Sequence, residues 1–208
     1  MKLPTVEECH GLFTQYHVPE NIHEHCTKVS EFATAIARKL RKTGIHLDVQ
    51  LVETGGLLHD WMKAVTLKEL GTDSYFRYTP TKEEIEAWKM LRARFAGKFK
   101  TQFYESDIAY ELLKETYPEL GEFILNEGKK NGTRIRTWEE KLVHYADWRV
   151  MGTKIVPLKV RMAYFFDRYK KNSSKAELQE WKIEQEIELN IEKEICTLIG
   201  CTSDELEK

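Results

Sequence analysis

An adjacent histidine and aspartate, His59 and Asp60, follow the apolar run Gly55-Gly56-Leu57-Leu58, and Lys63 comes one helical turn later. An imidazole beside a carboxylate suits a first-row transition metal, and additional oxygen ligands extend the choice to Mn or Mg. Neighbouring side chains on a helix point about 100° apart, so both reach one ion only if it lies between them at the helix surface. Two ligands alone bind a metal weakly, and the chemistry therefore depends on further ligands elsewhere in the chain.

Two more polar side chains lie where apolar neighbours predict burial. His25 is on the apolar face of a helix expected over residues 21 to 42, and Asp147 lies among apolar residues on a helix that Thr137 caps. A single histidine on an apolar face is more often a core residue with a hydrogen-bond partner. However, burying four such side chains on three central helices without partners would be costly. A shared metal ion is the simpler explanation, and the pair of glycines would let a second helix approach it closely.

The apolar residues recur at three- and four-residue spacing, which predicts an all-α chain with almost no strand. Helix starts are indicated at Thr5, Asn21, Asp48, Thr81 and Thr137. The expected helices cover residues 5–16, 21–42, 48–60, 106–117, 119–126, 137–150 and 176–199, with others starting at 81 and 157. We expect one domain over residues 1–172 with a variable insertion at about 64–104. Residues 173–208 would form an acidic amphipathic helix and tail, packed on the same domain or on a partner subunit.

Composition narrows the class of protein. The chain has 208 residues, of which 41% are hydrophobic and 32% charged, as in soluble helical proteins. No apolar run approaches the roughly 20 residues of a membrane span, and the N-terminus has no signal-peptide core. The net charge of -2 argues against a dedicated nucleic-acid binder. Cysteines occur at positions 9, 26, 196 and 201 without ligand-like spacing, which indicates a reduced, cytoplasmic protein.

Three stretches in order, residues 19–29, 51–63 and 139–150, carry a resemblance to a known family. They hold an early histidine, an adjacent His-Asp pair and a distant aspartate. This ordered set resembles the HD-domain superfamily of metal-dependent phosphohydrolases. The resemblance implies an HD-domain helical bundle, here with an additional C-terminal amphipathic helix. It also implies that one divalent ion (Mn, Fe, Co, Ni, Zn or Mg) binds to four ligands, His25, His59, Asp60 and Asp147.

The expectation of a single ion comes from a departure from the family pattern. Two-metal members have further histidines between the His-Asp pair and the last aspartate, whereas this chain has none between His59 and His144. Glu105 and Glu127 fall near those places and would be substitute ligands if a second site survived. We expect that the second site is lost.

The resemblance implies hydrolysis of a phosphomonoester or phosphodiester, most simply of a nucleotide, by attack of a metal-bound water. Asp60 would be catalytic as a ligand, and Lys63, on the same side of the helix, would bind the phosphate. Arg149 is a weaker phosphate-binding candidate, Trp61 a candidate for stacking on a base, and His144 a candidate for proton transfer. Single-metal members that resemble nucleotidases have a carboxylate at the position of Lys63, so that particular activity is in doubt.

Two alternatives remain open. The chain could be a non-catalytic, metal-containing module that binds a nucleotide or RNA, using the basic and aromatic residues from Trp88 to Lys100. It could also be a helical interaction protein with a degenerate site, built around the acidic C-terminal helix. The leading interpretation needs a small phosphorylated substrate as partner and no membrane, and it allows a homodimer.

Overall fold

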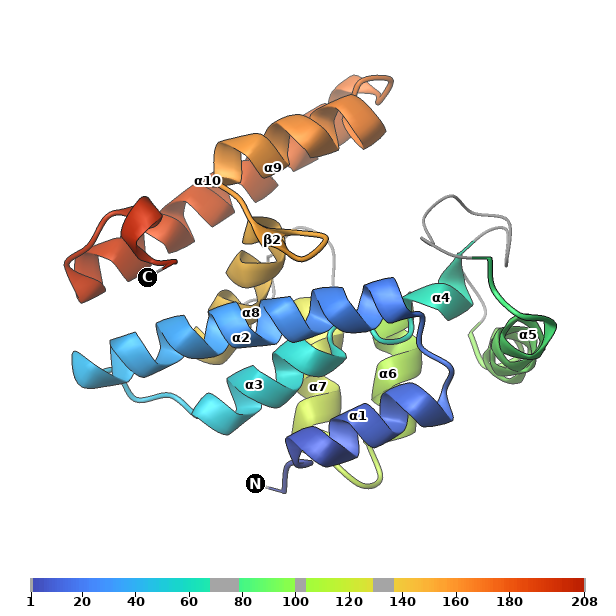
Figure 1. The fold of residues 1–208 in the computed structure, drawn as a ribbon. Coiled ribbons are helices and arrows are strands. Elements are labelled where there is room, and N and C mark those ends of the chain that lie inside the picture. The colour runs from blue at the N-terminus through green and yellow to red at the C-terminus, as the bar shows by residue number, and fades with distance from the viewer. Residues whose placement is uncertain (1, 68–78, 100–103, 129–136, 208) are drawn as a thin grey trace.

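The structure is a computed structural model of the chain and describes residues 2–67, 79–99, 104–128 and 137–207. Within these residues the fold is helical apart from one two-stranded hairpin, so the prediction of an all-α fold is confirmed (Figure 1). The helices are α1 (Val6–Gln15), α2 (Glu20–Lys42), α3 (Val49–Leu58), α4 (Lys63–Thr66), α5 (Lys82–Ala96), α6 (Glu105–Leu113), α7 (Pro118–Glu127), α8 (Trp138–Arg149), α9 (Leu158–Phe165) and α10 (Lys175–Ile199). None of the helices in these ranges has the length and apolar character needed to cross a membrane.

Local capping explains where several helices begin. At each of four helix starts a hydroxyl side chain accepts the N3 backbone N–H while a glutamate at N3 accepts the N-cap backbone N–H, and the capping residues are Thr5, Thr81, Thr137 and Ser174. The three starts predicted at threonines are therefore confirmed. The predicted start at Asn21 is wrong, because α2 already begins at Glu20, with Pro19 before it. Proline fixes φ near the helical value and lacks the N–H that would need a partner there.

The two glycines of α3 permit close packing on both sides of that helix. A Cβ added to Gly56 would lie 2.7 Å from the Cα of Ser30 on α2, and one added to Gly55 would lie 2.3 Å from the ring of Phe123 on α7. Any larger residue would force these elements apart. The expected reason for the glycine pair, close approach of another helix, is confirmed.

Helix α3 ends earlier than predicted. It stops at Leu58, and His59 and Asp60 lie in the turn before α4 instead of on the helix itself. The imidazole Nδ1–H of His59 donates to the carbonyl of Gly56, at 2.8 Å. A continuing helix would offer that carbonyl to the backbone N–H of Asp60. The side chain therefore ends the helix, and the turn frees both side chains from the angle that a helix would impose.

The C-terminal elements cover one side of α8. A hairpin of β1 (Val150–Met151) and β2 (Lys154–Ile155) turns through Gly152, whose φ is +65°, and leads into α9. A π-helical turn, Phe166–Lys170, then connects α9 towards α10, and the two helices lie side by side at the upper edge of Figure 1. Helix α10 packs on α8 and α2 of its own chain. The division into a domain and an appended helix remains a prediction.

Candidate metal centre

Two histidines meet between α2 and the end of α3, each oriented by a backbone carbonyl. His25 uses Nδ1 to donate to the carbonyl of Gly152, at 3.0 Å, and His59 uses Nδ1 to donate to that of Gly56, at 2.8 Å. In a neutral imidazole with a protonated Nδ1, Nε2 carries the free lone pair. A carbonyl on the outer nitrogen is the arrangement that orients metal-ligating histidines. Both rings thus turn Nε2 towards the carboxylates of the cluster, where Nε2 of His25 is hydrogen-bonded to Oδ1 of Asp147, at 2.9 Å. A metal bound there would replace this hydrogen bond.

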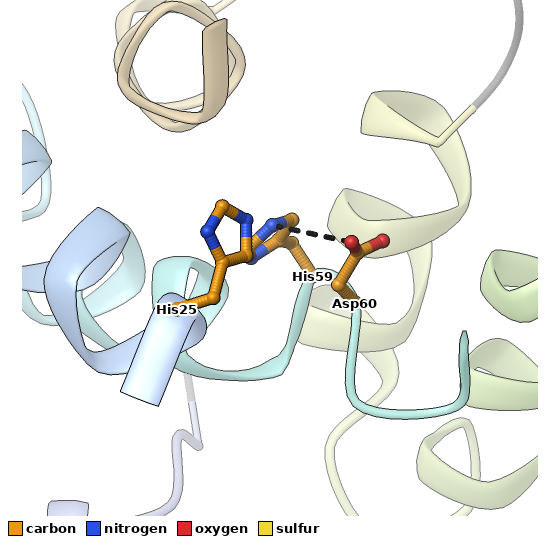
Figure 2. Close-up of side chains that lie close together, drawn as sticks. All are labelled: His25, His59 and Asp60. Atoms are coloured by element: carbon orange, nitrogen blue, oxygen red, sulfur yellow. Dashed lines mark ion pairs between the residues drawn. The ribbon is translucent and has the colours of Figure 1, made fainter. Parts of the chain in front are cut away.

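Two carboxylates complete the cluster. Potential ligand atoms of His25, His59 and Asp60 all lie within 4.8 Å of one another, and Figure 2 shows the two rings and the carboxylate gathered around one space. Asp147 joins them from α8, with Oδ1 2.9 Å from Nε2 of His25 and 3.7 Å from Nε2 of His59. The structure therefore brings together all four predicted ligands, from three separate parts of the chain.

One atom of this cluster has a specific need for a partner. Nε2 of His59 is buried and makes no hydrogen bond within the residues that the structure describes. Buried polar atoms in proteins are nearly always satisfied. A divalent ion between the imidazoles and carboxylates would satisfy it. Two nitrogens and two carboxylate groups are a ligand set that suits Mn, Fe, Co, Ni or Zn and, with more oxygen, Mg.

The charges at the site favour the ionised form of both carboxylates. Burial tends to raise the pKa of Asp147, but the hydrogen bond from His25 and the nearby ring of His59 outweigh it and hold that pKa well below its usual value. Burial also opposes ionisation of Asp60, yet Lys63 and His59 lower its pKa. Both carboxylates are therefore ionised at neutral pH. Burial disfavours the charged form of His59, but Cys26, Asp147 and Asp60 raise its pKa well above the usual value, so protons compete with a metal for this ring.

Lys63 lies at this centre at the start of α4, and its role in phosphate binding stays a prediction. Its Nζ is 2.8 Å from Oδ2 of Asp60 and 3.7 Å from Oε1 of Glu105. A third of its side chain surface is exposed. The ammonium group therefore neutralises a ligand carboxylate and still reaches solvent at the edge of the centre.

Trp61 and Arg149 do not fit their predicted roles in substrate binding. Trp61 is only 1% exposed and packs edge-to-face on Tyr16 in the core. Arg149 is fully buried, and it donates to the carbonyl of Val156 and to three side chains, those of Tyr145, Glu192 and Glu207. Two residues along α8 turn its side chain away from Asp147 towards the C-terminal helix, where it holds that helix and the tail in place.

His144 lies near Asp147 on α8 and has a partner that the sequence interpretation missed. Its Nδ1 is 2.6 Å from Oε1 of Glu188, a fully buried residue of α10. The position of Glu188 in the sequence could have indicated this partner, because Glu188 falls in the apolar stripe of α10, seven residues after Trp181 and three before Ile191. A charged residue in such a stripe needs a buried partner.

The two glutamates considered for a second metal have different surroundings. Glu105 contacts Lys63 and accepts a hydrogen bond from Thr66, at 3.3 Å. Glu127 is buried beside the centre, and burial raises its pKa, with Asp60 and Asp147 adding to the effect and His59 opposing it. Among the described residues, the histidines, cysteines and carboxylates close enough to share an ion form a single group. The expectation of one metal stays a prediction.

The basic segment considered for nucleic-acid binding has its aromatic residues turned inward. Trp88 is fully buried with Nε1 donating to the carbonyl of His17, at 3.0 Å, and Phe95 is 4% exposed. Arg92 is bound to the carbonyls of Val65 and Leu67. Lys100 and Phe103 lie outside the described residues. Buried rings are not available for stacking on bases.

Comparison with known proteins agrees with this geometry. The family model of the HD domain matches residues 22–152, which include all four candidate ligands. The uncharacterized protein MJ0778 of Methanocaldococcus jannaschii is 30% identical over 165 residues, which cover 74% of this chain and 80% of that protein. No solved structure matches the chain. The match to the family model, over more than half of the chain, shows that the chain belongs to the HD domain family.

Proposed function

We propose that the protein is a metal-dependent phosphohydrolase that acts on a phosphomonoester or a phosphodiester of a nucleotide. The observation that carries the proposal is the convergence of two carbonyl-oriented imidazoles with two ionised carboxylates, one imidazole nitrogen being buried without a partner. The family to which the chain belongs supports the same chemistry.

His25, His59, Asp60 and Asp147 would hold the ion. When bound, a divalent ion supplies Lewis acidity, which lowers the pKa of water and offsets the negative charge of a phosphoryl group. Lys63 contributes a positive charge at the edge of the centre, where its flexible side chain can move from Asp60 to a phosphate oxygen. His144 is close enough to Asp147 along α8 to reach a substrate bound there and is our candidate for proton transfer.

The partner we propose is a small phosphorylated molecule. A nucleic-acid-binding module that uses the basic segment is not favoured, because Trp88 and Phe95 lie in the core. All four cysteines are free thiols, which fits the cytoplasmic compartment that we propose.

Metal content and hydrolysis, measured on the same samples, test the proposal. We expect about one divalent ion per chain in the wild type and a loss of that ion in Asp60→Ala. Each sample would be incubated with Mn, Fe, Co, Ni, Zn or Mg and assayed with p-nitrophenyl phosphate, bis(p-nitrophenyl) phosphate and nucleotides. Asp204→Ala, which removes an exposed aspartate from the C-terminal tail, is the matched control and should keep both metal and activity.

Two results would contradict the proposal. Wild-type protein that takes up no ion from any of these salts would remove the metal centre. Protein that binds an ion through Asp60 but hydrolyses none of the phosphate esters would remove the enzymatic function and leave a metal-containing binding module.

A further inference from the structure

Glu188 is a charged residue on the inner face of the C-terminal helix. The buried residues of α10 are Trp181, Glu188, Ile191 and Ile195, and Glu188 is the single charged one among them, at 0% exposure. Burying a carboxylate without a partner is strongly destabilising. An apolar residue at this position would continue the stripe at no such cost. The carboxylate therefore calls for a specific explanation.

Its partner connects α10 to the metal centre. Oε1 of Glu188 is 2.6 Å from Nδ1 of His144, which is an ion-pair contact, and neither oxygen of Glu188 makes a hydrogen bond of regular geometry among the described residues. His144 comes three residues before Asp147 on α8, so the two side chains are neighbours on the helix surface. Glu188, although it lies outside the region that matches the HD domain, thus contacts a residue beside a candidate metal ligand.

The pairing fixes the orientation of the His144 ring. Nδ1 faces the carboxylate of Glu188 at ion-pair distance, which leaves Nε2 on the opposite side of the ring. Part of the ring remains accessible, since 14% of the His144 side chain is exposed. An imidazole held at one nitrogen by a buried carboxylate presents the other nitrogen in a fixed direction, as in the carboxylate–histidine pairs of hydrolases.

The charged groups around His144 favour its protonated form. Burial opposes its charged form, but Glu188 on α10, Glu127 on α7 and Asp147 on α8 raise the pKa of His144 to about 9. The ring thus carries a proton on both nitrogens at neutral pH. A bound ion would reduce the contribution of Asp147, whereas Glu188 would keep its effect because it does not belong to the metal centre.

Resting on the proposed phosphohydrolase function, we propose that Glu188 is a positioning residue that holds His144 so that its Nε2–H donates a proton to the leaving group of the substrate. In this step the oxygen of the attacking water bonds to phosphorus and releases a proton to solvent. The bond from phosphorus to the leaving oxygen breaks, its electron pair stays on that oxygen, and the Nε2 proton of His144 neutralises it. His144 then regains a proton from solvent.

A purely structural role, in which the ion pair only docks α10 on α8, makes a different prediction. Glu192 provides the matched control because it lies one turn further along α10 and also pairs with α8. It accepts a hydrogen bond from Tyr145, at 2.6 Å, and lies 3.1 Å from the guanidinium of Arg149. If docking alone matters, Glu188→Gln and Glu192→Gln should have similar effects on the reaction.

The first measurement needs no activity. NMR titration of the metal-free protein would follow the Cε1–H signal of His144, assigned with His144→Gln. We expect Glu188→Gln to lower the pKa of His144 by more than about one unit, because a neutral amide does not stabilise an imidazolium as a carboxylate does. Glu192→Gln should leave that pKa unchanged. An unchanged pKa in Glu188→Gln would overturn the pairing and with it the proposal.

The second measurement compares leaving groups in the metal-loaded enzyme. Phenolate is a poorer leaving group than p-nitrophenolate and depends more on a proton donor. We expect Glu188→Gln to lower kcat for phenyl phosphate by about tenfold or more, within the range of general-acid effects, and to lower kcat for p-nitrophenyl phosphate much less. KM should change little, Glu188→Asp should recover part of the rate, and Glu192→Gln should affect both substrates equally.

The outcomes separate this proposal from the proposed function. An active wild type in which Glu188→Gln slows both substrates equally, as Glu192→Gln does, would overturn the positioning role and leave the phosphohydrolase intact. A wild type that binds metal but hydrolyses neither substrate would overturn the function and the positioning role together, even if the NMR titration showed the pairing. A loss of kcat in Glu188→Gln that is larger with phenyl phosphate than with p-nitrophenyl phosphate would support both the phosphohydrolase function and the positioning role.

Discussion

Replacement of Gly56 by alanine tests whether the close packing of α2 on α3 builds the metal centre. The added Cβ would lie 2.7 Å from the Cα of Ser30 and 3.1 Å from its backbone nitrogen. Ordinary contacts between carbon atoms are about 3.5–4.0 Å, so the two helices must separate by about 1 Å. The obstructing atoms belong to the backbone of α2, and no change of rotamer can relieve the contact.

A second glycine allows the cost of overpacking at Gly56 to be separated from the effect of alanine on helix propensity. Gly11 lies inside α1 with nothing within 4 Å of an added Cβ. Alanine at an unobstructed helical position stabilises by up to about 1 kcal/mol relative to glycine, whereas overpacking costs about 1–3 kcal/mol. Gly11→Ala should therefore be neutral or stabilising. Gly56→Ala should be less stable than Gly11→Ala by about 1–3 kcal/mol. Both variants gain helix propensity from alanine, so this gain cancels when their stabilities are compared and the cost of overpacking remains.

The same substitution should weaken metal binding. His25 is on α2 and His59 follows α3, so a shift of about 1 Å between the helices exceeds the roughly 0.5 Å within which a site must be held. Urea unfolding of the metal-free variants would give the stability difference, and titration with Mn or Co would give the dissociation constants. We expect the dissociation constant of Gly56→Ala to rise at least about tenfold and that of Gly11→Ala to stay unchanged. Equal stability and equal affinity of the two variants would refute the reasoning.

Two further predictions concern the buried ion pairs of α8. Arg149→Met should lower the free energy of unfolding, measured in urea, by about 3 kcal/mol, because it leaves Glu192 and Glu207 without their cation. The metal content should stay at the wild-type level. A loss of stability below about 1 kcal/mol would contradict the role assigned to Arg149. The raised pKa of His144, about 9 against 6.5, means that its pairing with Glu188 stabilises fully below pH 6.5 and is lost as the pH rises to about 9. Because Glu127 and Asp147 also raise this pKa, only the share of Glu188 distinguishes the variant: over that interval the metal-free wild type should lose at least about 1 kcal/mol more stability than Glu188→Gln. Parallel curves in urea unfolding at each pH would contradict this.

The parts of the fold that could be predicted from sequence depend on residues close together in the chain. A capping box joins residues three apart, and the starts at Thr5 and Thr137 are predictable for that reason, while the start at Thr81 is predictable from the acidic residues that follow it. The apolar face of α2 likewise follows from spacing alone, and it placed His25 on the buried side. The ordered His, His-Asp and Asp pattern then identified the candidate ligands without any knowledge of how the helices pack.

The parts that could not be predicted depend on contacts between distant residues. The carbonyl that orients His25 belongs to Gly152, 127 residues away, and no local pattern marks it. Arg149 was a candidate for substrate because it is charged and close to Asp147 in sequence, but Glu192 and Glu207 from the C-terminal elements bury it. The end of α3 could not be predicted either, although the hydrogen bond from His59 to Gly56 joins residues only three apart. A histidine that follows an apolar run gives no sign that it will end the helix.

The position of Glu188 separates the candidate metal ligands from the residue that orients His144. The four candidate ligands and the carbonyls that orient the two histidines all lie within residues 22–152, the part that matches the HD domain. Glu188 lies outside it, on a helix held against α8 by the buried guanidinium of Arg149 and by the pair with His144. Metal binding can therefore be a property of the family segment alone, whereas the orientation of His144 requires the C-terminal helix. On this view the helix acts on the proton that reaches the leaving group.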